Sequence, residues 1–149
     1  MAKHFFTKAE QNDIIDAIKQ AELNTSGEIR LHIEAHCKKD AYERAREVFE
    51  QLGMHATDLK NGVLFYIAYE DHKLAILGDK GVHEKVTQQF WEDEKELLRS
   101  YFKQNKYAEG LMIAINKAGE KLQVYFPFQK NDTNELSNDI SFGGGVDAQ

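Results

Sequence analysis

Residues 60–81 read KNGVLFYIAYEDHKLAILGDKG and hold the clearest structural pattern in the chain. Residues 63–69 are an apolar run rich in β-branched and aromatic side chains, and residues 73–77 form a shorter one. A polar turn separates the two runs, so the pattern predicts two strands joined by a tight hairpin. Because a hairpin returns to its starting point, we expect Asn61 and Asp79 to lie close together.

Composition and charge limit the classes of protein to consider. A chain of 149 residues, 42% hydrophobic and 30% charged, predicts one soluble domain with a substantial core. Its net charge of −6 argues against a nucleic-acid partner and favours divalent cations. Cys37 is the only cysteine, the N-terminus lacks the apolar core of a secretion signal, and no run approaches the roughly 18 apolar residues of a membrane span. We therefore expect a monomeric cytoplasmic protein without direct membrane insertion.

The strand expected over residues 28–36 has a polar face. Its apolar residues alternate with Glu28, Arg30, His32, Glu34 and His36. Such alternation predicts a strand with one buried face, at a sheet edge or on a partly uncovered face rather than in a buried centre.

Helical patterns surround these strands. Thr7-x-x-Glu10 and Asp40-x-x-Glu43 have capping-box spacing and predict helices over 7–23 and 41–52. Apolar spacing predicts one long helix, or two with a break near Gln89, over 82–102, and another over 111–125 that Pro127 ends.

The order of strands and helices predicts the fold class. Strand, helix, strand implies a parallel crossover, and the hairpin adds an antiparallel strand. We expect an α/β fold, with a small mixed sheet packed between helices, over residues 1–128. Residues 129–149 are polar and glycine-rich and predict a poorly packed or flexible tail. The alternative is that residues 134–136 dock back on the domain.

Oxygen ligands gather at one end of the predicted sheet, where the first strand starts and the hairpin opens. Glu28, Asp58 and Asp79 supply carboxylates and Asn61 a carbonyl, which suits Ca²⁺ or Mg²⁺. The same residues have simpler explanations. Asp79 could only cap a helix, Glu28 could pair with Lys80, and Asn-Gly is a common turn.

Further polar groups lie at that end. A helix starting at Gly81 would favour an anion such as phosphate, with Thr25 and Ser26 as hydrogen-bond donors. His55 and His83 are candidate acid–base groups.

The opposite end of the sheet is the usual ligand-binding end of parallel strands. His36 and Cys37 are tempting metal ligands there, but neighbours on a strand point to opposite faces. The other polar residues at this end, Glu34, Glu70, Asp71 and His72, fit a strand end and a polar hairpin turn. No nucleophile motif occurs anywhere in the chain.

In several short motifs the chain resembles the TPM domain family, named from a thylakoid-lumen acid phosphatase, a photosystem II repair protein and a receptor modulator. The resemblance covers about residues 5–136 and rests on these segments: TSGEI (25–29), NGVLFYIA (61–68), HKLAILGDKG (72–81), FW (90–91), YAEGL (107–111) and YFP (125–127). NEL (134–136) followed by ISFG (140–143) also resembles the tail of a bacterial subgroup.

The resemblance implies an α/β/α sandwich. It also implies divalent cation binding, often of calcium, and acid phosphatase activity, both attributed to family members. Family motifs fall on Gly27-Glu28, Asn61-Gly62 and Gly78-Asp79, all at the first of the two ends. Many members also carry a signal peptide and a membrane anchor, and this sequence shows neither. We therefore expect a calcium-binding module with an interaction or accessory role, or alternatively a cation-dependent phosphatase acting on phosphate monoesters, with a phosphate ester or a protein as partner.

Overall fold

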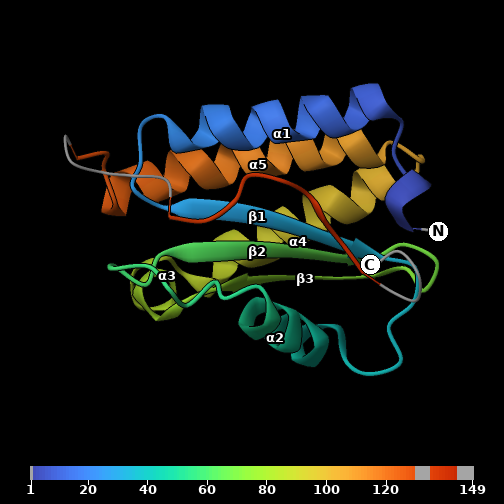
Figure 1. Ribbon diagram of the computed structural model, residues 1–149, viewed down its shortest axis with the longest axis horizontal. Helices are drawn as coiled ribbons and strands as arrows, with labels where there is room; N and C mark the ends of the chain where they lie inside the picture. Colours follow the sequence, from blue (N-terminus) through green and yellow to red (C-terminus); the bar gives the residue numbers. More distant parts are fainter. Residues whose placement is uncertain (1, 130–134, 144–149) are drawn as a thin grey trace.

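The computed structural model describes residues 2–129 and 135–143 and contains a mixed four-stranded sheet (Figure 1). The strands are β1 (Glu28–Glu34), β2 (Gly62–Ala68), β3 (Lys73–Gly78) and β4 (Ser141–Phe142), in the order β3-β2-β1-β4. β1 is parallel to β2 and β4, and β2 is antiparallel to β3. The predicted hairpin and the predicted parallel crossover are both confirmed.

Helices cover both faces of this sheet. They are η1 (Ala2–His4), α1 (Lys8–Glu22), α2 (Ala41–Gln51), α3 (Lys80–Lys85), α4 (Gln88–Phe102) and α5 (Tyr107–Tyr125). In Figure 1, α1 and α5 run side by side and α2 lies on the opposite side of the sheet. Thr7 and Glu10 form the predicted capping box, and Asp40 caps α2. The α/β/α sandwich predicted from the sequence is confirmed.

The alternation of side chains in β2 divides the core into two parts. Val63, Phe65 and Ile67 face the helices α1, α4 and α5, whereas Leu64 and Tyr66 face α2. All of β2 is buried, because it is covered on both faces and paired on both edges. Among the described residues, no helix has the length and hydropathy needed to cross a membrane.

The third predicted helical region is two helices. The break lies at Val86 and Thr87, slightly before the expected position at Gln89. Val86 takes an extended conformation and is buried in the core, and Thr87 occupies the N-cap position of α4. Burial of Val86 therefore fixes the break earlier than helical spacing suggested.

The segment 135–143 packs along β1, as its red ribbon shows in Figure 1. Leu136 is buried in the core beside α2, and Ile140 is buried in the core beside α1 and α5. β4 pairs with β1, and the Gly143 N–H donates to the Ile33 carbonyl at 2.9 Å. For Glu135 and Leu136 the docking alternative is therefore correct, and the expectation of a poorly packed tail is wrong for 135–143. Residues 130–134 and 144–149 of the predicted tail lie outside the described part of the chain.

The position of β1 corrects a second expectation. The strand is neither at an edge nor uncovered, since it lies between β2 and β4 and only Arg30 among its residues is partly exposed. Its polar face is buried because the segment 135–143 and α2 provide polar partners for it, which a sequence pattern of alternation does not reveal.

Candidate functional site

Asp79 lies at the open end of the hairpin, directly after β3. Its N–H donates to the Gly62 carbonyl at 2.9 Å, and its Oδ1 accepts the Lys80 N–H at 2.7 Å, so that Asp79 caps α3. Its other oxygen, Oδ2, is buried and accepts no hydrogen bond from the described residues. One oxygen of this carboxylate therefore has a structural role, and the other has no hydrogen-bond partner among the described residues.

Asn61 lies at the start of β2 and joins it to the start of β1. Its carbonyl accepts the Glu28 N–H at 3.2 Å, and its Nδ2 donates to the Ser26 carbonyl at 3.1 Å. Its side-chain Oδ1 is buried and has no partner in the described part of the chain. Asn61 and Asp79 thus flank Gly62 and each holds one unsatisfied oxygen, as expected for residues at the open end of one hairpin.

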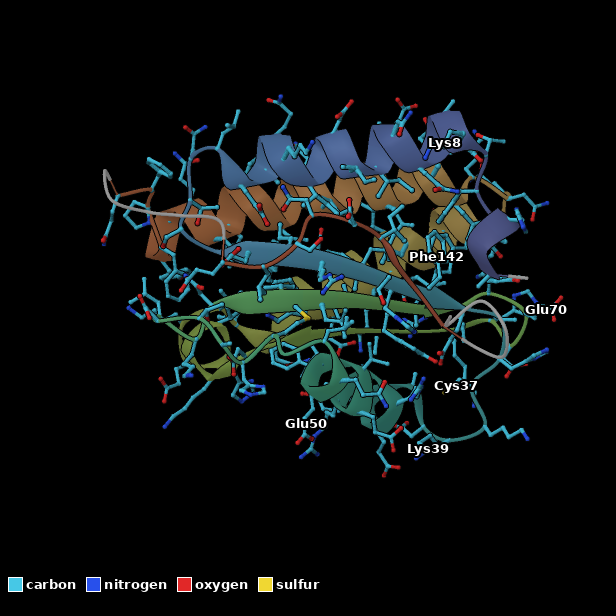
Figure 2. The ribbon with its side chains drawn as sticks, viewed as in Figure 1. Lys8, Cys37, Lys39, Glu50, Glu70 and Phe142 are labelled. Atoms are coloured by element: carbon cyan, nitrogen blue, oxygen red, sulfur yellow. The ribbon has the colours of Figure 1, made fainter. Side chains whose placement is uncertain are left out.

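Asp79 also lines a surface hollow of about 380 Å³ between α2 and β3. Glu50 and Arg46 of α2 line it, together with His55 from the loop that follows. Figure 2 shows Glu50 on the outer side of α2, in agreement with its exposure. The structure therefore brings His55 close to Asp79. His83 lies one turn of α3 beyond Asp79, and its N–H donates to the Asp79 carbonyl at 2.9 Å, but it lines a different groove, along the other side of β3.

Glu28 faces the C-terminal segment. Its carboxylate accepts the backbone N–H groups of Leu136 at 2.8 Å and Glu135 at 3.1 Å. Burial raises the pKa of Glu28 to about 7, although the hydrogen bond from Leu136 opposes this. Both oxygens of this predicted metal ligand thus hold the segment 135–143.

The remaining predicted groups at this end do not converge. The Thr25 hydroxyl donates to the Phe126 carbonyl and accepts the Gly27 N–H, so it is used within the fold. Ser26 Oγ accepts from Asn61 Nδ2 at 3.4 Å, and Asp58 is exposed. Within residues 2–129 and 135–143, no three His, Cys, Asp or Glu side chains are grouped so that they could hold a metal ion. Of the proposed ligands, Asn61 and Asp79 are the two with unsatisfied buried oxygens.

A buried ionic network that the sequence pattern did not predict lies farther along β1. Glu34 accepts two hydrogen bonds from Arg44 of α2, at 2.9 and 3.0 Å, and further ones from His32 and Tyr66. Burial opposes ionisation of Glu34, but the bonds from His32, Arg44 and Tyr66 outweigh it and lower its pKa to about 2. The Glu34 carboxylate is thus fully paired with groups of the same chain, which indicates that the network has a structural role. The only signal in the sequence was the polar alternation of β1.

The C-terminal segment closes this network. His32 Nδ1 lies 2.9 Å from Ser141 Oγ. Gly143 packs so closely on His32 Nε2 and Glu34 Oε1 that a Cβ has no room there. His32 and Glu34 are therefore covered by a segment more than a hundred residues away in the sequence, whereas Arg44 remains partly exposed.

At the opposite end of the sheet, His36 is an exposed surface residue. It pairs with Glu70 at 2.9 Å and with Asp71 at 3.0 Å. Cys37 is buried, and its Sγ contacts the Lys39 carbonyl at 3.1 Å. The two side chains do not meet, in agreement with their predicted opposite orientation. Glu70 and Asp71 thus belong to a polar hairpin turn, which was the alternative to a metal site at this end of the sheet.

Similarity to known proteins extends over nearly all of the chain. The family model of the TPM domain matches residues 2–121. The NMR structure of the BA42 protein from the psychrophilic bacterium Bizionia argentinensis is 46% identical, covers 93% of this chain and 96% of that one, and has a TM-score of 0.88.

A more distant structure shares the fold. The N-terminal domain of the cg2496 protein from Corynebacterium glutamicum, solved by NMR, is 11% identical, covers 95% of this chain and 82% of that one, and has a TM-score of 0.63. No functionally curated protein matches the chain. The resemblance seen in the motifs is thus confirmed by matches in both sequence and structure.

Proposed function

Because this chain belongs to the TPM domain family, we propose that it is a divalent-cation-binding module whose site lies at the open end of the β2–β3 hairpin. One observation supports this proposal above all. Asn61 Oδ1 and Asp79 Oδ2 are both buried and both lack a partner among the described residues. The cation would be Ca²⁺ or Mg²⁺.

Unsatisfied buried oxygens favour a ligand because they are costly. A buried acceptor without a partner costs about 1 to 3 kcal/mol, and more when it carries charge. Ca²⁺ and Mg²⁺ bind oxygen ligands of these two kinds, a carboxylate and an amide carbonyl. The chemistry of Asn61 and Asp79 therefore fits a hard cation better than it fits a soft metal.

The small number of protein ligands predicts a weak site. The nearby Glu28 holds the C-terminal segment, and Asp58 is exposed. A cation at Asp79 would therefore keep several waters, as Mg²⁺ commonly does when one or two carboxylates bind it. Glu50 lines the same hollow and could contribute charge. Bound in this way, the cation would stabilise the loops at the open end of the hairpin by mass action.

Hydrolysis of phosphate monoesters is the second candidate function. Arg46 and His55 line the same hollow as Asp79. An arginine there would bind a phosphate group, and a histidine would donate a proton to the leaving group. A cation bound there would polarise a phosphoryl oxygen. We rank this function second because Thr25, the expected phosphate ligand, has its hydroxyl bonded to the Phe126 carbonyl.

A cation titration with Asp79→Asn tests the first function. Asparagine preserves the helix cap but removes the negative charge, so the fold is retained. We expect Ca²⁺ or Mg²⁺ to shift the amide signals of Asn61 and Asp79 in the wild type, with binding about tenfold weaker in the variant. Asp58→Asn, which removes an exposed carboxylate from a neighbouring loop, is the matched control. If neither cation moves these signals, or if both variants bind like the wild type, the proposed site is wrong.

A phosphatase assay separates the two functions. The wild type, Asp79→Asn and His55→Gln are compared on p-nitrophenyl phosphate with Ca²⁺ or Mg²⁺ present. Loss of hydrolysis in both variants would make the chain a phosphatase. Hydrolysis at the same background rate in all three proteins would leave the cation-binding module as its function.

A further inference from the structure

The outer edge of β3 is free in the described part of the chain. β3 is the end strand of the sheet and pairs only with β2. The Asp79 N–H donates to the Gly62 carbonyl, so Asp79 and Gly62 form a hydrogen-bonded pair. Such pairs alternate along an antiparallel ladder, so the backbone groups of Lys73, Ala75 and Leu77 bond to β2. The backbone N–H and carbonyl groups of Leu74, Ile76 and Gly78 therefore point away from the sheet. Such a row is a template for another strand.

Two adjoining hollows run along this edge. The first, of about 440 Å³, lies between the start of α2 and the side of α4. The second, of about 330 Å³, lies between the β2–β3 turn and the end of α4. They share His72, Lys73, Leu74 and Arg99, so they form one continuous depression, which we name the β3 groove. Side chains of the two helices rise on either side of the free backbone edge.

Positive charge dominates the β3 groove, although the whole chain has a net charge of −6. Its lining includes one carboxylate, Asp40, which caps α2, and four basic residues: Lys73, Lys95, Arg99 and Lys103. Lys95 pairs with Glu92 at 3.0 Å and Arg99 with Glu96 at 2.9 Å, both on the surface of α4. Exposed pairs of this kind are weak, so the charges remain available to an acidic ligand.

The end of the groove near the turn is apolar and aromatic. Tyr69, Phe102 and Tyr107 line it, and the rings of Phe102 and Tyr107 stack with centroids 4.4 Å apart. Among the described residues, no carboxylate lines this part of the groove. At the other end, Tyr42 is 46% exposed. The groove therefore combines a backbone edge, a basic rim and a pocket for a large apolar side chain.

We propose that the β3 groove binds an extended acidic peptide segment of a partner protein, which pairs with the outer edge of β3 as an additional strand. The main chain of the segment bonds to Leu74, Ile76 and Gly78, its acidic side chains face Arg99 and Lys103, and one apolar side chain enters the aromatic pocket. Strand addition with pockets for alternate side chains is a known mode of peptide recognition. Gly78 lines both this groove and the hollow beside Asp79, but the groove uses neither of the two proposed cation ligands, Asn61 and Asp79, so the proposal stands independently of cation binding.

A synthetic peptide tests this directly. The probe is an acetylated and amidated peptide of alternating glutamate and valine with a C-terminal leucine, titrated into the ¹⁵N-labelled protein. We expect amide shifts at Leu74, Ile76 and Gly78 and in the second half of α4, with affinity falling as salt rises. A lysine–valine peptide of the same length should cause none of these shifts.

Protein variants separate charge from backbone pairing. Reversing Arg99→Glu and Lys103→Glu together should weaken binding of the acidic peptide at least about tenfold. Lys8→Glu, a charge reversal at the start of α1, is the control and should leave binding unchanged. Lys8 lines neither hollow, and Figure 2 shows it on the outer helix layer, across the sheet from α2. Ile76→Pro removes an outward N–H without touching the ladder to β2, and should abolish binding.

Modified peptides make the test independent of any folding defect in Ile76→Pro. N-methylation of alternate peptide bonds keeps the charges but blocks strand pairing, and should abolish binding to the wild type. Equal binding of the methylated peptide would overturn strand addition. Shifts confined to Phe102 and Tyr107 would indicate binding in the aromatic pocket alone, without strand pairing, and would also overturn the proposal. So would the absence of any shift at millimolar peptide.

Discussion

The carboxylate of Glu28 accepts a hydrogen bond from the backbone N–H of Leu136 at 2.8 Å, across 108 positions of the sequence. Its second oxygen accepts the Glu135 N–H, and its own N–H donates to the Asn61 carbonyl. One residue thus connects β1, the start of β2 and the C-terminal segment. Asn61 of the candidate cation site and the docked segment are therefore both held by Glu28.

Truncating Leu136 should loosen the docked segment. Leu136 is 9% exposed and packs in the core beside α2. We expect Leu136→Ala to lower the free energy of unfolding by about 2 kcal/mol, at the lower end for buried leucines because the site lies near the surface. Urea unfolding measures this. Ser137→Ala, at an exposed neighbour, should cost less than about 1 kcal/mol, and equal losses would contradict the docking of Leu136.

Stability should be greatest near pH 4.5 to 5. Burial raises the pKa of Glu28 to about 7 and those of Glu22 and Glu94 to about 8. Between their ordinary pKa and these values, the folded chain holds protons that the unfolded chain has lost, so stability falls as pH rises from about 4.5 to about 8. Glu34 has the opposite effect, because its lowered pKa makes stability fall between about pH 4.5 and pH 2. Urea midpoints measured from pH 3 to pH 9 check both limbs, and a maximum at about pH 7 or above would contradict the assignment.

Glu94→Gln should reduce the alkaline loss of stability. Glu94 is 2% exposed on α4, and its Oε2 has no partner among the described residues. Glutamine has nearly the same shape without the charge, so the variant should be more stable than the wild type at pH 8 and similar to it at pH 4.5. Paired thermal melts at the two pH values measure the difference. A variant less stable than the wild type at pH 8 would contradict the burial of a charged Glu94.

Arg44 should contribute far more to stability through Glu34 than through Glu47. Arg44→Met leaves the buried Glu34 carboxylate without its main cation and should cost about 3 kcal/mol at pH 7. Glu47→Gln breaks only exposed bridges, those to Arg44 and Lys39, and should cost much less. Urea unfolding of both variants gives the comparison. Similar losses would mean that the two bridges are equivalent.

Local patterns in the sequence were enough to predict most of the fold. The hairpin follows from two apolar runs around a polar turn, and the first two long helices follow from their N-cap residues, Thr7 and Asp40, and helical spacing. These signals lie within a few residues of one another, so short-range chemistry determines them. The sandwich then follows, because alternating strands and helices have few ways to bury their apolar faces.

The long-range contacts could not be predicted in this way. β4 is only two residues long and lies in a polar stretch of sequence. It forms because β1 has a second edge that β2 leaves unpaired, and because His32 and Ser141 are hydrogen-bonded through their side chains. The polar face of β1 indicated only that polar partners exist, not that they are the segment 135–143 and Arg44. At the candidate site, the spacing predicted the position of Asn61 and Asp79 near the hairpin opening, but not that Glu28 is occupied by backbone N–H groups.

The pairing of β1 with β4 has a consequence for synthesis of the protein. β1 is made early, but residues 141–142, which cover its second edge, emerge from the ribosome only after more than a hundred further residues. Until then, a growing chain exposes an open strand edge and an uncovered ionic network around Glu34. Such an intermediate is a target for chaperones and prone to aggregation, and its lifetime depends on the speed of translation rather than on the stability of the finished domain.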